Sequence, residues 1–386
     1  MSVNRSLRSK SIARTSTVVA AAALAVTSMI AAGGCESSDP TPTNPVGGGG
    51  SGGSPGAKCS PDEGTAPMDG VSCAAMPDDY TPRESGSSTD TWPACISDKN
   101  DYVPFDMNIS SLARVAAFEQ IRELLDIGGT GVPTPQDFLD ARVIYAQEQG
   151  IESRVSRRED EHYPPAPAAC RDMPPAEQQM YPDRCVGPVK IRPILNAAFE
   201  GGIAGESPVE NAARIEGALL WFFYVSIYKE ATTAAQNAVD VDSMWAKYTG
   251  GEPREGGIGL SGYIKPRSQE AHDRIWDGLL AVRCWRDLDN PTGAAMDLAL
   301  RDRARAQLDR ALLRGMALIL RQRLERVECA AAWESVKILG GVLDREATAR
   351  DPANAAILRV EIQKPTAKDV DVAAATGAID AIFPCP

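Results

Sequence analysis

The sequence predicts an all-α protein, an irregular multi-helix bundle that follows an irregular, disulfide-pinned N-terminal lead-in. Three observations lead to this fold class. Apolar residues recur at helical spacing from about residue 105 onward, and strand-like alternation is rare. Eight cysteines follow an N-terminal segment of the export type. Residues 105–386 are numerous enough to bury a sizeable core.

Residues 1–34 have the three parts of an export signal. Basic residues come first, an uncharged apolar stretch runs from Val18 to Ile30, and small residues follow. The longest unbroken apolar run, Val18 to Val26, has nine residues, whereas a membrane-spanning helix needs roughly 20 predominantly apolar ones. The segment is therefore predicted to be a signal peptide that is removed. Its basic residues are Arg5, Arg8, Lys10 and Arg14.

The residues Ala32-Gly33-Gly34-Cys35 resemble the lipobox of bacterial lipoproteins, although Ala32 stands where that family usually has Leu. The resemblance covers only these positions. It implies that Cys35 receives lipid, becomes the new N-terminus and anchors an exported protein, in the outer membrane or at the cell surface rather than in the inner membrane. Acyl chains supply about 0.8 kcal/mol per buried CH₂, so several chains would hold the protein firmly. The alternative is an ordinary secretory signal cleaved nearby, with Cys35 as one more thiol.

Two further segments precede the predicted helical domain at 105–386. Residues 35–57 are rich in Gly, Ser and Pro and cannot bury enough apolar surface to become ordered, so they are predicted to be a tether. About 20 residues of this kind reach on the order of 25 Å. Residues 58–104 contain cysteines and little periodicity, and we expect an irregular segment packed on the main body.

The charge of the chain excludes two classes of partner. There are 40 Lys and Arg against 52 Asp and Glu, a formal net charge of −12. Removal of residues 1–34, which hold four basic and no acidic side chains, would leave −16. Nucleic acid and anionic lipid surfaces repel such a body. We therefore expect no nucleic-acid partner, and contact with a membrane through the lipid anchor alone.

The cysteines other than Cys35 are predicted to form four disulfides, because the compartment outside the cytoplasm is oxidising. Their spacing fits neither zinc nor redox sites. Cys59 with Cys73, and Cys170 with Cys185, are close enough in sequence for local loops. The eight are Cys59, Cys73, Cys95, Cys170, Cys185, Cys284, Cys329 and Cys385.

The first helices follow from apolar periodicity. Apolar residues from Ile109 to Leu125 line one side of a helix that Gly128-Gly129 ends, and Phe138 to Tyr145 mark a second. Ser207-Pro208-Val209-Glu210 predicts a third start, with Ser207 as the cap and Glu210 reaching back. The residues that follow, Ala218 to Tyr228, are apolar on nearly every side, which predicts a central helix surrounded by others.

The second half of the chain predicts a long helical hairpin and shorter helices. Ser268 caps one helix, and a second one is expected from Thr292 to about Arg326, with Met296 on its apolar face. The arginines of its other face are expected to meet carboxylates or solvent. A straight helix of about 35 residues spans roughly 50 Å, so Cys284 and Cys329 should not pair. Further helices are expected at 330–343 and in the Ala-rich tail. The arginines are Arg301, Arg303, Arg305, Arg310, Arg314, Arg321 and Arg323.

Two short motifs match catalytic or cofactor patterns only by letter. Gly257 to Gly262 reads G-x-G-x-x-G, but no strand is predicted before it, so we interpret it as a flexible loop. Ser226 and Lys229 have the S-x-x-K spacing of penicillin-binding enzymes, but Ser226 lies deep inside a predicted helix. The two histidines are interpreted as structural or surface residues, with His162 in a solvated charged stretch and His272 in the first turn of a capped helix.

If the body has a pocket, we expect it just past the central helix, because loops carry function more often than cores do. An EF-hand calcium loop is excluded there, since Met244 and Gly251 occupy ligand positions. No metal site and no cofactor is predicted. The candidate lining residues are Glu230, Asp240, Asp242, Trp245, Tyr248 and His272.

These observations favour a non-enzymatic lipoprotein of the cell envelope that binds a small ligand or an envelope protein. An alternative comes from a resemblance in size and architecture to imelysin-type lipoproteins, which implies metal or ligand binding. The G-x-H-x-x-E motif of that family is absent, because Ile275 follows His272 and Pro165 follows His162 at the position of the Glu. Another alternative is a hydrolase that uses two carboxylates on envelope glycans. Asp and Glu are too plentiful for the sequence to nominate the pair.

Overall fold

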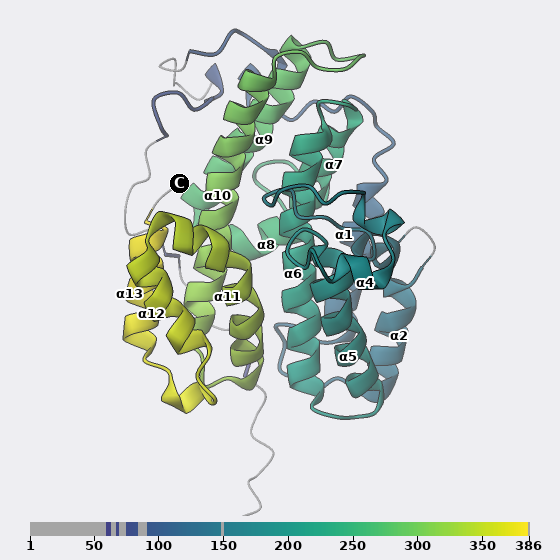
Figure 1. Ribbon diagram of the computed structural model, residues 1–386, viewed down its shortest axis with the longest axis vertical. Helices are drawn as coiled ribbons and strands as arrows, with labels where there is room; N and C mark the ends of the chain where they lie inside the picture. Colours follow the sequence, from purple (N-terminus) through teal and green to yellow (C-terminus); the bar gives the residue numbers. More distant parts are fainter. Residues whose placement is uncertain (1–58, 63–66, 69–74, 84–90, 148–149, 385–386) are drawn as a thin grey trace, which may run out of the picture. The chain divides into compact units, whose positions relative to one another are not determined.

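The computed structural model describes residues 59–62, 67–68, 75–83, 91–147 and 150–384, and within these ranges it is helical without strands. The predicted all-α, multi-helix fold is therefore confirmed (Figure 1). The predicted signal, Cys35 and the tether lie outside the described residues. The helices are α1 Ser111–Leu124, α2 Pro135–Tyr145, α3 Ile151–Val155, α4 Pro175–Gln178, α5 Arg192–Ile203, α6 Pro208–Thr233, α7 Val239–Thr249, α8 Leu260–Ile264, α9 Gln269–Leu288, α10 Leu298–Glu325, α11 Ala330–Arg350, α12 Pro352–Ile362 and α13 Val372–Ile382.

The central helix is α6, as its apolar sequence predicted. Its residues from Ala218 to Tyr228 are all buried, and it packs against α5, α7, α10 and α11. Ser207 is its N-cap residue, as predicted, but the predicted capping hydrogen bond is absent. Ser207 lies in the left-handed region at φ +38°, and its hydroxyl accepts no cap hydrogen bond. The tight turn after Gly205, at φ +77°, carries the chain into that conformation, while Pro208 still starts the helix.

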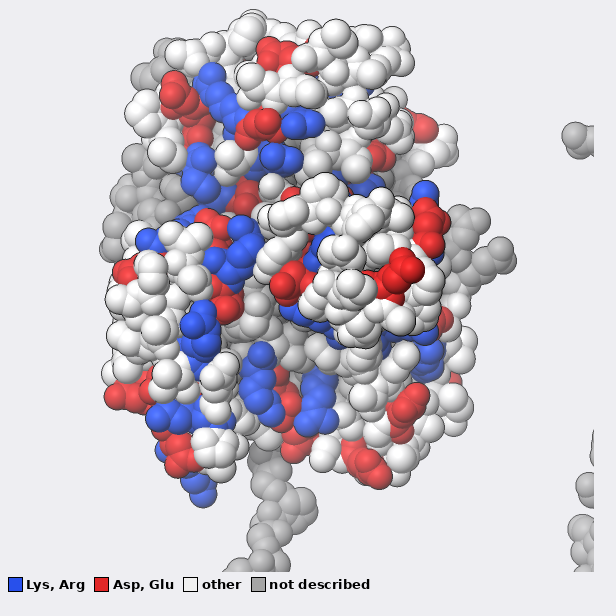
Figure 2. Space-filling model, in the orientation of Figure 1, with Lys and Arg blue, Asp and Glu red and all other residues white. Residues whose placement is uncertain are grey.

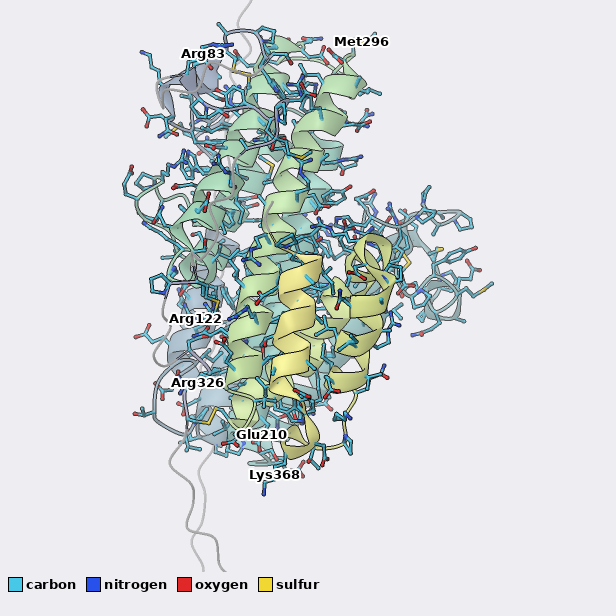
Figure 3. All side chains as sticks on the ribbon, turned by 90° about the vertical axis from the view of Figure 1, so that its left-hand side faces the viewer. Arg83, Arg122, Glu210, Met296, Arg326 and Lys368 are labelled. Atoms are coloured by element: carbon cyan, nitrogen blue, oxygen red, sulfur yellow. A yellow bond between two sulfur atoms is a disulfide. The ribbon has the colours of Figure 1, made fainter. Side chains whose placement is uncertain are left out.

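Helices α9 and α10 form the long hairpin. The cap of α9 is confirmed, because the Ser268 hydroxyl accepts the Ala271 N–H. Helix α10 begins at Leu298, later than the predicted Thr292, because the Asp289 carboxylate accepts the N–H groups of Met296 and Asp297 and holds them in the turn. Figure 3 shows Met296 at one end of this helix and Arg326 at the other.

Two of the disulfides within the described part of the chain join segments that are distant in sequence, and a third closes a short loop. Cys59 is bonded to Cys329 and Cys95 to Cys284, so the predicted Cys59–Cys73 loop is wrong. Packing of the lead-in on the body, which sequence distance does not reveal, decides these partners. Cys170–Cys185 is confirmed, and Cys284 and Cys329 do not pair with each other. Cys73 and Cys385 lie outside the described residues.

The lead-in is irregular and packed on the body, with the 3₁₀ helix Ile96–Lys99 as its regular element. Tyr80 and Trp92 are buried in the main core. The Gln307 side chain of α10 receives a hydrogen bond from the N–H of Tyr80 and donates one to its carbonyl, both at 2.8 Å. Among the described residues, no helix is both long and apolar enough to cross a membrane.

The arginines of α10 meet carboxylates and carbonyls of neighbouring segments, as predicted. Arg310 contacts Asp79 of the lead-in at 2.5 Å, and Arg321 contacts Asp380 of α13 at 2.8 Å. Arg323 differs from the rest because its side chain is completely buried.

Candidate functional site

The residues predicted to line one pocket lie in three places. The first holds Asp242 and Trp245 of α7. The Asp242 carboxylate accepts the N–H groups of Phe105 and Asp106, each at 2.9 Å, and the Tyr102 hydroxyl at 3.0 Å. Burial nevertheless raises its pKa. The Trp245 ring stacks on Tyr102, with centroids 4.5 Å apart. These contacts fasten the end of the lead-in to α7.

The second place is a buried pair between α7 and α9. The Tyr248 hydroxyl donates to Nδ1 of His272 at 3.0 Å, and Nε2 of His272 donates to the Arg254 carbonyl at 2.8 Å. The carbonyl fixes this tautomer, since it can only accept. Burial lowers the pKa of His272, so the ring is neutral and structural.

The third place is the C-terminal part of α6. Glu230 is buried and contacts Lys247 at 2.7 Å and Lys229 at 3.0 Å, and Lys229 also reaches Asp240 at 3.9 Å. Burial opposes ionisation of Glu230, but the neighbouring cations hold its pKa well below the usual range. Burial lowers the pKa of Lys247 to about 8. Of the six predicted residues, Glu230 lines the pocket described next, and the other five are engaged in internal contacts.

A pocket of about 200 Å³ lies beside Glu230, where the segment after α3 crosses α6. In Figure 1 this segment is drawn as dark teal loops in front of α6, and Figure 2 shows Lys, Arg, Asp and Glu mixed on that face. We call it the arginine pocket. Its lining residues are Arg154, Arg157, Arg158, Glu159, Glu161, Ala169, Arg171, Lys229 and Glu230.

Close backbone packing holds the arginines of the pocket in place. The Arg158 carbonyl accepts the N–H of Gly187 at 2.9 Å, and the N–H of Asp160 donates to the Arg184 carbonyl at 2.9 Å. A Cβ at Gly187 would lie 2.0 Å from the Val155 carbonyl oxygen, so this approach requires glycine. The neighbouring Cys170–Cys185 disulfide closes the same segment.

The carboxylates of the arginine pocket already have partners. Arg184 contacts Glu159 at 2.8 Å and Glu161 at 2.9 Å. Glu230 is bound by Lys247 and Lys229. The acidic side chains of the pocket are therefore neutralised mainly by Arg184, Lys229 and Lys247. Three neighbouring arginines of the lining, Arg154, Arg157 and Arg158, contribute little to this.

Those three arginines lack such compensation. Within the described part of the chain, Arg154 and Arg157 make no ion pair within 4.0 Å, and Arg158 has only Glu230, at 3.9 Å. The Arg158 side chain is 7% exposed, and its Nε–H has no hydrogen-bond partner among the described residues. A buried donor on a charged group that stays unpaired is costly.

The pKa values of three arginines in and beside the pocket are lowered, as expected where positive charges are crowded together. Burial lowers the pKa of Arg154 and of Arg158; the neighbouring guanidinium groups lower both further, and Glu230 offsets only part of the shift. Arg114 of α1 belongs to the same group, and burial together with repulsion by Arg154 lowers its pKa to about 10. An oxyanion in the pocket would relieve this repulsion, because it could accept hydrogen bonds from several guanidinium groups at once.

The structure corrects the interpretation of His162, which is not solvated. Its side chain is 3% exposed, with Nδ1 2.6 Å from Asp160 and Nε2 3.0 Å from Asp309 of α10, and its ring stacks on Tyr228 at 3.6 Å. Burial opposes protonation, but the two carboxylates raise its pKa to about 9. His162 therefore anchors the segment that carries the pocket arginines. The described residues contain no cluster of three or more His, Cys, Asp or Glu suited to a metal ion.

The two short motifs also have a structural place. Ser226 is fully buried in α6, and its hydroxyl lacks a hydrogen-bond partner among the described residues. Gly257 and Gly259 have positive φ angles in a turn that leads into α8. No strand precedes this turn in the described part of the chain. Neither motif has the structural context that its chemistry requires.

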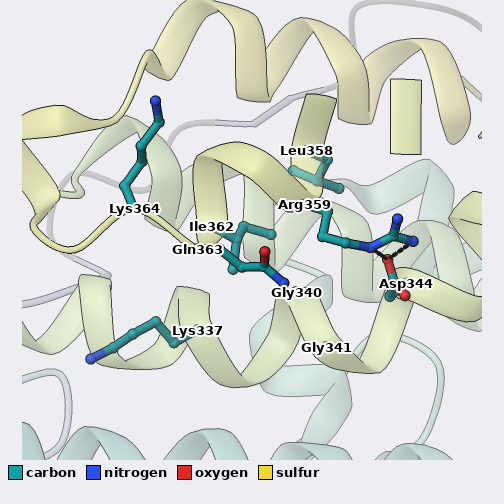
Figure 4. A pocket seen from close by; sticks show the side chains of 9 residues that line it. All are labelled: Lys337, Gly340, Gly341, Asp344, Leu358, Arg359, Ile362, Gln363 and Lys364. Carbon is teal, nitrogen blue, oxygen red and sulfur yellow. Dashed lines mark hydrogen bonds and ion pairs between the residues drawn. The ribbon is translucent and has the colours of Figure 1, made fainter. Parts of the chain in front are cut away.

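A second hollow, of about 460 Å³, lies between α11 and α12 (Figure 4). Its cations are paired: Arg359 contacts Asp344 at 2.6 Å, Lys337 contacts Glu334 at 2.6 Å, and Lys364 lies 3.7 Å from Glu361. The unpaired charge of the arginine pocket is missing here, so the arginine pocket is the better candidate site.

Sequence reasoning overlooked the pocket arginines. The available signal was the dense basic run from Arg154 to Arg158, directly before the acidic run Glu159 to Glu161. Such a run normally indicates a solvated surface.

No family model matches the chain, and no curated protein or solved structure is significantly similar to it.

Proposed function

We propose that the protein is a non-enzymatic lipoprotein of the cell envelope, anchored through Cys35, whose helical body binds a small anionic ligand in the arginine pocket. One observation carries the binding part of this proposal. Arg158 is buried with an unused Nε–H donor, beside two arginines that lack ion-pair partners among the described residues. A bound anion would supply the acceptors and the negative charge that this cluster lacks.

The ligand is small because the pocket is small. Sites for drug-sized ligands have about 300–1,000 Å³, whereas the arginine pocket has about 200 Å³. A phosphate or carboxylate group fits this chemistry, since guanidinium groups bind both in a bidentate way. The net charge of −12 repels anions at long range, so recognition depends on the local cluster.

The binding part is tested by isothermal titration calorimetry of the purified protein with inorganic phosphate at low ionic strength. Arg158→Met should abolish the binding heat. Arg359→Met removes the same charge from the hollow between α11 and α12, where Arg359 is paired with Asp344, and it should bind phosphate like the wild type. Equal loss in both variants, or no binding heat from the wild type, would contradict the proposal.

The anchoring part is tested separately in cells. Cys35→Ala, or globomycin, should abolish labelling by a fatty-acid probe and block maturation. An unchanged, labelled mature form of the Cys35→Ala variant would refute lipidation at Cys35. Titration of the same protein with divalent metal ions tests the imelysin-like alternative, which requires a binding heat that His272→Ala or Asp242→Ala removes.

A further inference from the structure

A larger hollow continues from the arginine pocket. It has about 800 Å³, and two arginines, Arg157 and Arg171, line both spaces. The small pocket alone is below the usual size of a ligand site, but together with the hollow it reaches that range. The lining residues of the hollow are Ser153, Ser156, Arg157, Arg171, Asp172, Met173, Pro175, Gln178 and Arg192.

The hollow supplies a second set of donors for an anion. Arg192 begins α5, is exposed, and makes no ion pair with the described residues. Arg171 has Asp172 at 3.6 Å, but both side chains are more than 60% exposed, so water screens this pair strongly. Three arginines and one acidic residue, Asp172, line the hollow. Two of these arginines, Arg157 and Arg192, make no ion pair with a carboxylate of the described residues.

The hollow also has uncharged side chains between the arginine pocket and Arg192. Ser153 and Ser156 donate their hydroxyls to backbone carbonyls of the same turn, at 3.1 Å each, which leaves their oxygens able to accept hydrogen bonds. Met173 is buried and supplies apolar surface. A polar linker with some apolar surface would lie well on this lining.

We infer that the ligand carries two oxyanion groups, and that the arginine pocket and the hollow are two subsites of one site. Arg158 and its neighbours bind the first group, Arg192 and Arg171 bind the second, and Arg157 lies between them. This inference rests on the proposed anion binding. It adds the chemical class of the ligand, which is a bisphosphate or another bis-anionic small molecule with a short polar linker.

The test compares probes that have one and two phosphate groups. Inorganic phosphate and glucose 6-phosphate carry one, while pyrophosphate and fructose 1,6-bisphosphate carry two at different separations. We expect at least one two-phosphate probe to bind about tenfold or more tightly than both one-phosphate probes, since the second group binds at high effective concentration. Citrate in place of phosphate distinguishes a carboxylate ligand from a phosphorylated one.

Variants assign the two subsites. Arg192→Met should remove most of the advantage of the two-phosphate probe and leave inorganic phosphate binding unchanged, whereas Arg158→Met should abolish both. Arg359→Met controls for the loss of one positive charge, and circular dichroism checks folding. If phosphate binds but neither two-phosphate probe binds more tightly, the two-subsite inference is refuted and the proposed function stands. If no probe binds, the proposed function fails as well.

Discussion

Two buried arginines in this molecule, Arg323 and Arg158, have different surroundings. Arg323 of α10 is completely buried and contacts the equally buried Glu216 of α6 at 2.9 Å, with Asp62 of the lead-in at 3.5 Å. Tyr263 donates its hydroxyl to Glu216 at 2.5 Å, and a guanidinium N–H of Arg323 donates to the Ser335 hydroxyl oxygen. Among the described residues, the pocket arginines Arg154 and Arg157 make no ion pair, and Arg158 has only Glu230, at 3.9 Å, which two lysines also bind. We call Arg323 and the residues around it the Arg323 cluster.

The difference separates a structural role from a binding role. In the Arg323 cluster burial opposes the charge, but Glu216 and Asp62 raise the pKa of Arg323, so the charge is held firmly. In the arginine pocket burial lowers the pKa of Arg158, and Glu230, opposed by the neighbouring guanidinium groups, does not restore it. The charge of Arg323 is matched by carboxylates within the fold, although its Nε–H, like that of Arg158, has no hydrogen-bond partner among the described residues. Two of the three pocket arginines, Arg154 and Arg157, make no ion pair with the described residues, so there a charge-matching anion is what the fold does not supply. Sites that bind ligands commonly sacrifice stability in this way.

The largest expected effect comes from breaking the Arg323 cluster. Glu216→Gln leaves Arg323 buried without its nearest carboxylate and should lower the free energy of unfolding by about 3–5 kcal/mol. Urea denaturation with the disulfides intact measures it. Glu334→Gln is the control, because its partner Arg214 is 37% exposed, and such pairs contribute about 1 kcal/mol or less. Equal losses would show that burial does not distinguish the two ion pairs.

The second-largest effect on stability is expected at His162. Its positive charge is paired with carboxylates, as that of Arg323 is, but it lies next to the arginine pocket. Its pKa is raised from 6.5 to about 9 in the folded state, so its stabilising contribution is complete below pH 6.5 and is lost as the pH rises through 9. A shift of this size corresponds to on the order of 3 kcal/mol.

His162→Gln removes this titration. The groups around it remain, namely Asp160, Asp309, Tyr224, Tyr228, Arg305 and Arg345. The difference in unfolding free energy between wild type and variant should therefore shrink between pH 6 and pH 10. A difference that stays constant over this range would show that His162 does not titrate as the structure indicates.

The smallest effect is expected in the pocket itself. Arg158→Met removes a buried charge whose one carboxylate partner is distant, at 3.9 Å, and Glu230 keeps both lysines, so the free energy of unfolding should change by less than about 1 kcal/mol or rise. The same urea titration, without added anion, measures it. A loss as large as that of Glu216→Gln would mean that Arg158 is structural and that the contrast between the two groups is false.

The sequence predicted the features that depend on local pattern. Helical periodicity identified α6 and the α9–α10 hairpin, and short separation identified the Cys170–Cys185 bond. The start of α10 was wrong because a carboxylate at Asp289 captures two backbone N–H groups beyond its own helix. Propensity rules do not include such a contact.

The candidate site could not be predicted, because its character depends on contacts that are distant in sequence. His162 and Asp309 are 147 residues apart, and that contact turns an apparently solvated histidine into a buried cation. In the sequence, Arg158 belongs to a charged run that is expected to be exposed to solvent. In the fold it is buried beside Glu230 of α6, which Lys229 also contacts. The sequence shows the sign of each charge, but it does not show which charges form ion pairs in the fold.

The bond between Cys59 and Cys329 also decides how mechanical force enters the molecule. Cys59 stands near the start of the lead-in, and Cys329 lies between α10 and α11. Tension applied along the preceding chain therefore passes through sulfur directly to this junction, and the intervening 270-residue separation forms a closed loop that bears little of the load. Reduction of this single bond would redirect the pull into the lead-in as far as Cys95, where the bond to Cys284 would take up the load.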